Sequence, residues 1–252
     1  MRFQIATYNI HKGFSHLNRR MVIHELRDRL VGLDPDILFL QEVVGGNERH
    51  AARHLDWPVK PQHEFIAGAV WHEIAYGKNA VHRHGHHGNA VLSRFPIIAH
   101  ENQDISAHAF ESRGLLHCEI RLGRNRPALH CINVHLGLFE RGRAQQVHAL
   151  CDRIAATVPR DSPLVIAGDF NDWRHKANRT LVRELGVAEV FEAVKGRPAR
   201  TFPSVLPVFR LDRIYARGLV IVDAHVHYAF PRARLSDHAA LAATFETPRR
   251  AR

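Results

Sequence analysis

The sequence predicts an α/β (α+β) protein in which mixed β-sheets are covered by helices. Apolar runs of strand length dominate the chain of 252 residues, and helices with one apolar face are interspersed among them. Several predicted strands follow each other directly, so the order differs from the regular strand–helix alternation of a doubly wound parallel sheet. A mixed sheet system with helices on the outside fits this order best.

The N-terminal half begins with a strand and a helix. Residues 3–8 form an apolar run of strand length. Apolar residues then recur on one helical face, which predicts a helix over 18–32, and the sequence DPD ends it. The other elements expected in this half are a short buried strand at 37–43, a helix at 47–55, and a strand within 88–97 that Pro96 ends.

The C-terminal half contains the clearest helix, over 142–158, where the apolar residues form one stripe. Pro159 and Pro163 separate this helix from the apolar strand LVIAGD, residues 164–169. The other strands expected in this half span 115–121, 128–134, 211–216, 219–228 and 239–245.

One domain over residues 1–247 is the simplest organisation, because the chain shows no repeat and no linker-like tract. We expect the basic tail 248–252 to be disordered. No apolar run approaches the length of a membrane span, and a strand-like segment starts at Phe3, where a signal peptide would need its apolar stretch. A cytoplasmic monomer is therefore expected. The three cysteines have no CxxC spacing, which predicts reduced, mostly buried thiols.

The formal net charge is +10 and the pI is about 10.2. Such an excess suits an anionic partner, such as a nucleic acid, a lipid head group or a phosphorylated metabolite. Solubility alone would explain it equally well.

Four apolar strands end on side chains that can bind a cation, move a proton or hold an oxyanion, namely Asn9, Glu42, His135 and Asp169. Two further sites of this kind are Asp212, within an otherwise apolar and basic strand, and the pair Asp237 and His238 before the last strand. Active sites in α/β folds gather beyond the carboxyl ends of strands. A single such ending is usually a strand that meets solvent, whereas four matched endings indicate one shared site.

These residues also carry a resemblance to a known family. In order along residues 4–245, the segments TYNIHKG, LQEV, GNAVLSR, NVHLGL, GDFNDW, LDRIY and SDH resemble those of the endonuclease/exonuclease/phosphatase superfamily. That superfamily includes pancreatic deoxyribonuclease, apurinic endonucleases, neutral sphingomyelinases and inositol polyphosphate phosphatases. The sequences of these segments are similar to those of an uncharacterised bacterial branch. The resemblance implies a four-layer α/β sandwich, with two sheets face to face and helices outside. It also implies hydrolysis of a phosphate ester with a divalent metal, Mg²⁺ or Mn²⁺.

The resemblance implies a role for each candidate residue. Glu42, Asn9 and Asp237 would serve the metal, since hard oxygen ligands suit Mg²⁺. His238 would orient or deprotonate the attacking water while Asp212 holds its ring, and Asp169 would position that water. Asn171 and His135 would donate to the phosphoryl oxygens. The set implied to contact substrate or support the site floor is Arg113, Asn89 and His11.

Each motif also has a purely structural interpretation. Glu42 could be the acid at the start of a helix, SDH a polar strand cap, and DFND an Asx turn. Asp172 is expected to serve only that turn and is not a catalytic candidate. His11 departs from the apurinic endonucleases, which carry an acid at that place. We expect the His-rich segment 82–87 to be a surface or substrate-contact loop rather than a zinc site, and Glu73 is one candidate for the acid that supports His135.

The substrate is open at this point. A nuclease is favoured by the net charge, whereas a phosphodiesterase or phosphatase on a phospholipid or small ester is favoured by the missing acid at position 11. A binding protein that kept the fold and lost catalysis should have lost some of the site residues, and none is missing.

Overall fold

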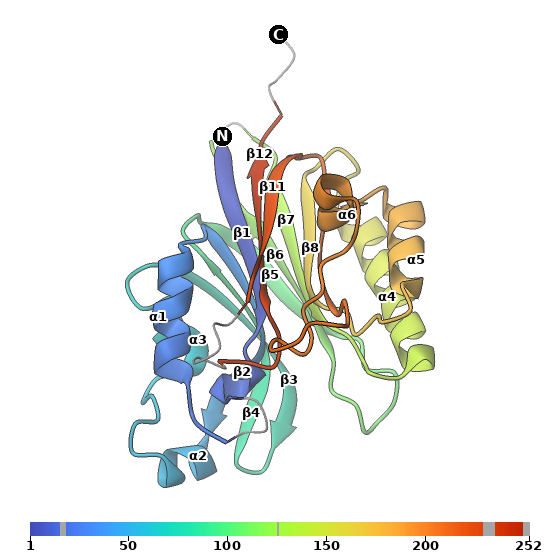
Figure 1. The fold of residues 1–252 in the computed structure, drawn as a ribbon. Helices are drawn as coiled ribbons and strands as arrows, with labels where there is room; N and C mark the ends of the chain where they lie inside the picture. Colours follow the sequence, from blue (N-terminus) through green and yellow to red (C-terminus); the bar gives the residue numbers. More distant parts are fainter. Residues whose placement is uncertain (16–18, 125, 229–234, 249–252) are drawn as a thin grey trace.

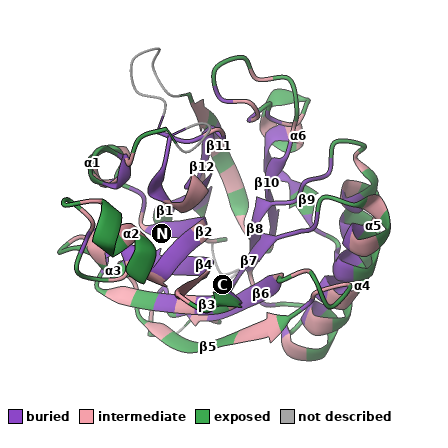
Figure 2. Ribbon diagram, turned by 90° about the horizontal axis from the view of Figure 1, so that it is seen from below, coloured by how far each residue is buried: buried purple, intermediate pink, exposed green. Residues whose placement is uncertain are grey.

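The computed structural model describes residues 1–15, 19–124, 126–228 and 235–248. Two six-stranded mixed sheets pack face to face, with helices on both outer surfaces (Figure 1). Seen from below, α1, α2 and α3 lie outside one sheet, and α4 and α5 lie outside the other (Figure 2). The predicted four-layer α/β sandwich is therefore confirmed.

The first sheet has the order β11–β12–β1–β2–β4–β3, and only β1 and β2 pair in parallel. Its strands are β1 (Arg2–Asn9), β2 (Ile37–Asn47), β3 (Glu73–His82), β4 (Gly85–Ser93), β11 (Val220–His227) and β12 (Ala240–Glu246).

The second sheet has the order β5–β6–β7–β8–β10–β9, and here β7 and β8 are the parallel pair. Its strands are β5 (Ile97–Asp104), β6 (Gly114–Ile120), β7 (Leu129–His135), β8 (Leu164–Asp169), β9 (Ala188–Glu189) and β10 (Asp212–Arg217).

Three apolar layers hold the sandwich together. In the run ILFL of β2, Ile37 and Phe39 belong to the core between the sheets, whereas Leu38 and Leu40 belong to the core beneath the helices. Both faces of such a strand are buried, so its sequence is continuously apolar. The third layer lies between the second sheet and its helices, where Ile132 of β7 packs with Leu150 of α4.

The helices cover the outer faces of the sheets. The first sheet carries α1 (Ile23–Leu33) and α3 (Gln62–Ala67), and the second carries α4 (Glu140–Thr157) and α5 (Lys176–Leu185). Shorter elements are η1 (His11–Gly13), α2 (Glu48–Arg53) and α6 (Val190–Lys195). None of the helices in the described ranges is long and apolar enough to cross a membrane.

Most predicted elements are confirmed, with boundary shifts. Helix α1 begins at Ile23 instead of residue 18, because Phe14 and Met21 form an isolated bridge just before it. Residues 16–18 lie outside the described residues, as does most of the tail 248–252. The three cysteines are free and buried, as predicted.

Several elements were not expected from the sequence, namely β3, β5, β9, α3, α5, α6 and η1. Both β3 and β5 are edge strands with half-exposed or exposed residues, so they lack the continuous apolar run that marked the central strands. Segment 82–87 is the turn and flanks of the β3–β4 hairpin and not an open loop.

Candidate active site

Both sheets deliver polar side chains to the same end of the sandwich, which is the lower end in Figure 1. In the second sheet, Asp169 of β8 lies in register with His135 of β7 and with Asp212 of β10. Asn9 reaches them from the first sheet, and its Nδ2 donates to Oδ2 of Asp169 at 3.1 Å. The predicted strand endings therefore meet across the interface between the sheets.

Asp169 lies at the centre of this group and is 1% exposed. Its Oδ2 lies 3.5 Å from Nε2 of His135 and 3.7 Å from Nε2 of His238. Burial raises the pKa of Asp169 to about 6, and the Asp212 carboxylate adds to the rise, while His238 opposes it. A carboxyl group with a pKa near neutrality is suited to accept a proton.

Gly168 makes this arrangement possible. Its φ of +142° is outside the range that L side chains favour, and a Cβ there would lie 2.0 Å from the carbonyl oxygen of Val134. The glycine thus allows β7 and β8 to approach closely just before His135 and Asp169. This is the physical reason for the glycine in GDFN.

His238 and Asp212 form the tightest charged pair of the site. Nδ1 of His238 lies 2.8 Å from Oδ2 of Asp212, and both side chains are buried. Burial lowers the pKa of His238, but the Asp212 and Asp169 carboxylates outweigh burial and raise it to about 10. Asp212 therefore fixes the ring and directs Nε2 toward Asp169.

The segment 236–238 is held in place by its own hydroxyl and an aromatic ring. Ser236 Oγ donates to the carbonyl oxygen of Asn9 at 2.7 Å and accepts from the backbone N–H of His238 at 3.2 Å. The Phe202 ring lies 5.0 Å from the His238 ring, centroid to centroid. Ser236 was not singled out in the sequence, although it begins the quoted SDH motif.

His135 differs from His238 in its charge state. Burial lowers the pKa of His135 well below its ordinary value, and the positive charge of Arg113 lowers it further. His135 is therefore a neutral donor or acceptor at neutral pH. Arg113 itself has Nε 3.8 Å from Oε1 of Glu111, and this Nε is buried with no hydrogen-bond partner.

The DFND turn divides its polar groups between site and scaffold. Asn171 has a φ of 49°, its backbone N–H donates to Oδ1 of Asp169, and its Nδ2 donates to the carbonyl oxygen of Leu136. One of its two amide hydrogens is thus already used. Asp172 accepts from the backbone N–H groups of Lys176 and Ala177, so it stabilises the start of α5, a helix that was not expected from the sequence.

Glu42 is brought to the site by a bulge in β2. The register to β4 shifts between Leu40 and Val43, and Glu42 has a φ of 57°. The bulge places Val43, instead of Glu42, in the apolar layer beneath the helices. Glu42 Oε1 then lies 3.4 Å from Nδ2 of Asn9.

Lys12 and His87 are neighbours of Glu42 that the sequence analysis did not select. Nζ of Lys12 lies 3.8 Å from Oε2 of Glu42. Burial lowers the pKa of His87 to about 4, and Lys12 lowers it further, while Glu42 opposes the shift. Only the position of Lys12 directly after His11 could have indicated its place.

The oxygen donors of the site fit a hard divalent cation. Ligand atoms of Asp169, Asp212 and His238 lie within 4.8 Å of one another, which in the described ranges is the one cluster of this kind. His238 offers no free lone pair at neutral pH, because Nδ1 is bound to Asp212 and the raised pKa keeps the ring protonated. The carboxylates remain as ligands, and Oδ1 of Asp212 is a buried acceptor with no hydrogen-bond partner.

Asp237 and His11 lie at the edge of the site. Nε2 of His11 lies 4.0 Å from Oδ2 of Asp237, and the His11 backbone N–H donates to Oδ1 of Asn9. Each of the two side chains is 18% exposed, so they are more accessible than the core of the site.

Asn89 lies beneath the site and not on its surface. It is 1% exposed, and its Nδ2 donates to the carbonyl oxygen of Gly114 at 3.0 Å, which ties β4 to β6. This bond fixes the position of Gly114, the residue that follows Arg113 in the sequence. Glu73 does not support His135: it pairs in register with Ser93, and its Oε2 accepts from the Ile97 backbone N–H, so that expectation was wrong.

Comparison with known proteins agrees with this geometry. The model of the Endonuclease/Exonuclease/phosphatase family matches residues 6–238. YbhP of Escherichia coli K12, itself uncharacterised, is 46% identical over 244 residues, which cover 96% of this chain and 95% of that protein.

Solved structures share the fold. An endonuclease/exonuclease/phosphatase from Bacteroides vulgatus aligns with a TM-score of 0.75 at 17% identity, covering 98% of this chain and 100% of that one. TDP2 of D. rerio, in complex with a single-strand DNA product, aligns with a TM-score of 0.74 at 17% identity, covering 98% and 99%. The chain belongs to the endonuclease/exonuclease/phosphatase family, whose members are generally hydrolases of phosphate esters and include metal-dependent nucleases and phosphatases.

Proposed function

We propose that this protein is a phosphodiesterase that hydrolyses a phosphate ester by in-line attack of water and depends on a divalent metal. The observation that carries the proposal is the bonded pair of His238 and Asp212, with Asp169 only 3.7 Å from the His238 ring. An acid near neutral pKa beside a fixed imidazolium forms a proton-handling site.

The protein groups divide the reaction between them. A water that contacts both Asp169 and Nε2 of His238 would give its proton to Asp169 as it attacks phosphorus. His135 and the free amide hydrogen of Asn171 would donate to the phosphoryl oxygens as negative charge develops. Arg113 would bind another phosphate oxygen, since its guanidinium lies close enough to lower the pKa of His135.

Glu42 and Asp237 would hold Mg²⁺ or Mn²⁺, with Asn9 as a neutral neighbour that orients the carboxylates of Glu42 and Asp169. When bound, such a cation stabilises the charge on the phosphoryl oxygens and on the leaving group.

Two substrate classes have support. A nuclease is supported by the net charge of +10 and by the fold shared with TDP2, whose structure holds a single-strand DNA product. A phospholipid or another small ester is supported by large apolar side chains that are exposed on the loops around the site, such as Phe139. A catalytically inactive binding protein has less support, because none of the residues proposed for the site is missing from the sequence.

One hydrolysis screen tests the proposal. Purified protein with Mg²⁺ or Mn²⁺, or with EDTA, is incubated with supercoiled DNA, single-stranded DNA, bis-p-nitrophenyl phosphate, phospholipids and inositol phosphates. The His238→Ala variant runs alongside, with His100→Ala as the matched control, since His100 is exposed on β5.

We expect metal-dependent cleavage of at least one diester by the wild type and by His100→Ala, with loss in EDTA and in His238→Ala. Cleavage of DNA alone, weakened by salt, would assign a nuclease. Cleavage of lipids with DNA intact would assign the second class. No cleavage with any metal, or equal cleavage by His238→Ala, would refute the proposal.

A further inference from the structure

The most exposed large apolar side chains lie in loops around the candidate site. Five large apolar residues of the described chain have exposures of 72–105%, while the next, Val81, has 67%. They are Leu55, Val59, Phe110, Phe139 and Leu206. Scattered exposed apolar residues need no explanation, but a gathering of the most exposed ones at one place indicates an interaction surface.

The topology places these loops at one end of the sandwich. Phe139 follows β7, and Phe110 precedes β6, which is antiparallel to β7. Leu206 precedes β10, whose first residue, Asp212, lies in register with the last residue of β8. Leu55 and Val59 follow β2 and α2, beyond Glu42. All five therefore surround the site that is formed by the strand ends.

Loop 196–211 is the densest part of this surface. Besides Leu206 it exposes Val205, Val208 and Phe209. It contains three arginines and no acidic residue. Its stem is fixed: the carbonyl oxygen of Phe209 accepts from the backbone N–H groups of Thr201 and Phe202, and the Ser204 N–H donates to the carbonyl oxygen of Asp237. An apolar tip is thus held on an ordered stem beside the site.

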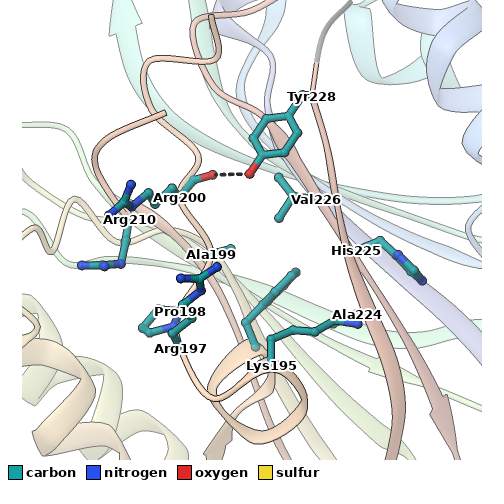
Figure 3. Close-up of a pocket in the computed structure, with 11 residues that line it drawn as sticks. Lys195, Arg197, Pro198, Ala199, Arg200, Arg210, Ala224, His225, Val226 and Tyr228 are labelled. Carbon is teal, nitrogen blue, oxygen red and sulfur yellow. Dashed lines mark hydrogen bonds between the residues drawn. The ribbon is translucent and has the colours of Figure 1, made fainter. Parts of the chain in front are cut away.

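A basic cavity of about 580 Å³ opens beside this stem, between α6 and β11 (Figure 3). Its cationic lining is Lys195, Arg197, Arg200, Arg210 and His225, and no acidic residue is among the lining residues. The apolar part of its wall includes Phe191 and Val226. Such a cavity suits an anionic group that is attached to an apolar one.

Two arginines of the cavity lack a counter-charge. The carboxylate of Asp223 contacts both Lys195 and His225, so the ammonium group of Lys195 has a counter-charge. Arg197 and Arg200, in contrast, form no ion pair with any carboxylate of the described residues, and both are exposed. Guanidinium groups without a carboxylate partner are well suited to bind phosphate oxygens.

We propose that loop 196–211 and the apolar residues around the site dock the protein on an anionic phospholipid bilayer. Val205, Leu206, Val208 and Phe209 enter the interface, and the cavity with Arg197 and Arg200 binds the phosphate of a lipid head group. Apolar side chains beside basic ones are the pattern of interfacial membrane binding. This names a lipid as the substrate class, and in that respect it rests on the proposed function.

Nucleic acid fits the surface less well. Bases stack on aromatic rings, which Phe110, Phe139 and Phe209 of this surface offer. Its aliphatic members offer no stacking face, and they are Leu55, Val59, Val205, Leu206 and Val208. Aliphatic side chains gain most where they leave water for an apolar phase. A free phosphate metabolite would use the cavity but would leave the apolar side chains without a role.

Vesicle co-sedimentation tests the docking directly. Wild type is mixed with vesicles of phosphatidylcholine alone or with 30% phosphatidylglycerol, a composition of about physiological anionic content. The variants are Leu206→Asp and Arg197→Gln/Arg200→Gln, with Val182→Asp as the control, because Val182 is exposed on α5 away from these loops. Circular dichroism checks that each variant is folded.

We expect binding to the anionic vesicles only, at least about tenfold weaker partitioning for Leu206→Asp and for the double arginine variant, and wild-type binding for Val182→Asp. Failure to bind anionic vesicles, or equal losses in Val182→Asp, would overturn the proposal. His238→Ala should bind vesicles like wild type. A wild type that binds anionic vesicles but hydrolyses no diester would count against the proposed function alone.

Two further arms distinguish other ligands. Inorganic phosphate is titrated by calorimetry, and single-stranded oligonucleotide is titrated by fluorescence anisotropy. Binding of free phosphate without vesicle binding would assign the cavity to a soluble anion and overturn the docking. Oligonucleotide binding that is lost in Leu206→Asp, in the absence of vesicle binding, would overturn it in favour of nucleic acid.

Discussion

His238 and Asp212 face each other across the two sheets of the sandwich, with Nδ1 and Oδ2 2.8 Å apart. His238 precedes β12 of the first sheet, and Asp212 begins β10 of the second. The pair therefore forms only when the sheets pack in their native arrangement. The geometry of the candidate site therefore depends directly on the core between the sheets.

Replacing Asp212 by Asn should remove the charge that fixes His238 while keeping the shape of the side chain. We expect kcat for the best diester substrate to fall by about 10²–10⁴-fold, as for other orienting carboxylates of catalytic histidines. Steady-state kinetics with Mg²⁺ measure this. Asp28→Asn, on the exposed face of α1, is the control, and equal activity of the two variants would contradict the assigned role.

Asn133 should be essential for stability, because it joins the sheets beneath the site. Its Nδ2 donates to the carbonyl oxygens of Leu40 and Ala90 at 2.9 and 2.8 Å, and its Oδ1 accepts from Gln41 Nε2 at 2.8 Å. Asn133→Ala removes three buried hydrogen bonds and should lower the free energy of unfolding by about 2–4 kcal/mol.

Urea unfolding at neutral pH measures this loss. Asn178→Ala is the matched control, since it removes a single partly buried bond of 3.3 Å to Glu192 and should cost less than about 1 kcal/mol. Similar midpoints for the two variants would show that the Asn133 network contributes little.

Glu42→Gln should weaken Mg²⁺ binding more than it lowers the rate of hydrolysis at saturating Mg²⁺. Gln keeps an oxygen ligand but loses the negative charge that a hard cation prefers. We expect the Mg²⁺ concentration for half-maximal activity to rise by more than about tenfold, with partial recovery of rate at high Mg²⁺. Glu48→Gln, at a residue whose side chain is 83% exposed, should titrate like wild type, and an identical shift in both would exclude Glu42 as a ligand.

Glu189 should make stability depend on pH. Burial raises the pKa of Glu189 to about 7, and its Oε1 is buried without a partner. Because the folded pKa lies above the unfolded value of about 4.5, the fold holds a proton that the unfolded chain releases. The contribution of protonated Glu189 to the free energy of unfolding is fully present below pH 4.5, and it is lost as the pH rises through about 7.

Glu189→Gln should abolish this loss, because Gln stays neutral and can still accept from the Glu192 backbone N–H. Relative to wild type, we expect the variant to gain on the order of 2–3 kcal/mol between pH 4.5 and pH 8. Thermal unfolding at these two pH values measures the gain. A difference between variant and wild type that stays constant with pH would refute the assignment.

The sequence predicted the site better than the edges of the fold. Asn9, His135 and Asp169 were visible because each ends a buried apolar run, and a run of this kind is a local property of the sequence. The edge strands β3 and β5 were missed because exposed positions interrupt their apolar pattern. Helix α5 did carry a signal, since Ala177, Leu181 and Leu185 recur at spacings of four, but it was not recognised.

Long-range geometry could not be predicted from the sequence. The bulge that turns Glu42 toward Asn9 depends on pairing with β4, and the proximity of Lys12 to Glu42 depends on the left-handed backbone of η1. Glu73 was a candidate partner of His135 because the sequence does not show at which end of a strand it lies. The structure places it at the start of β3, in register with Ser93.

Hydrolysis of bis-p-nitrophenyl phosphate in H₂¹⁸O with Mg²⁺ is the sharpest test of water attack at phosphorus. We expect one ¹⁸O atom in each p-nitrophenyl phosphate released and none in the p-nitrophenol. His238→Ala should release neither product above the background rate. Label in the p-nitrophenol, or no turnover by the metal-loaded wild type on this or any other diester, would contradict the proposed hydrolysis.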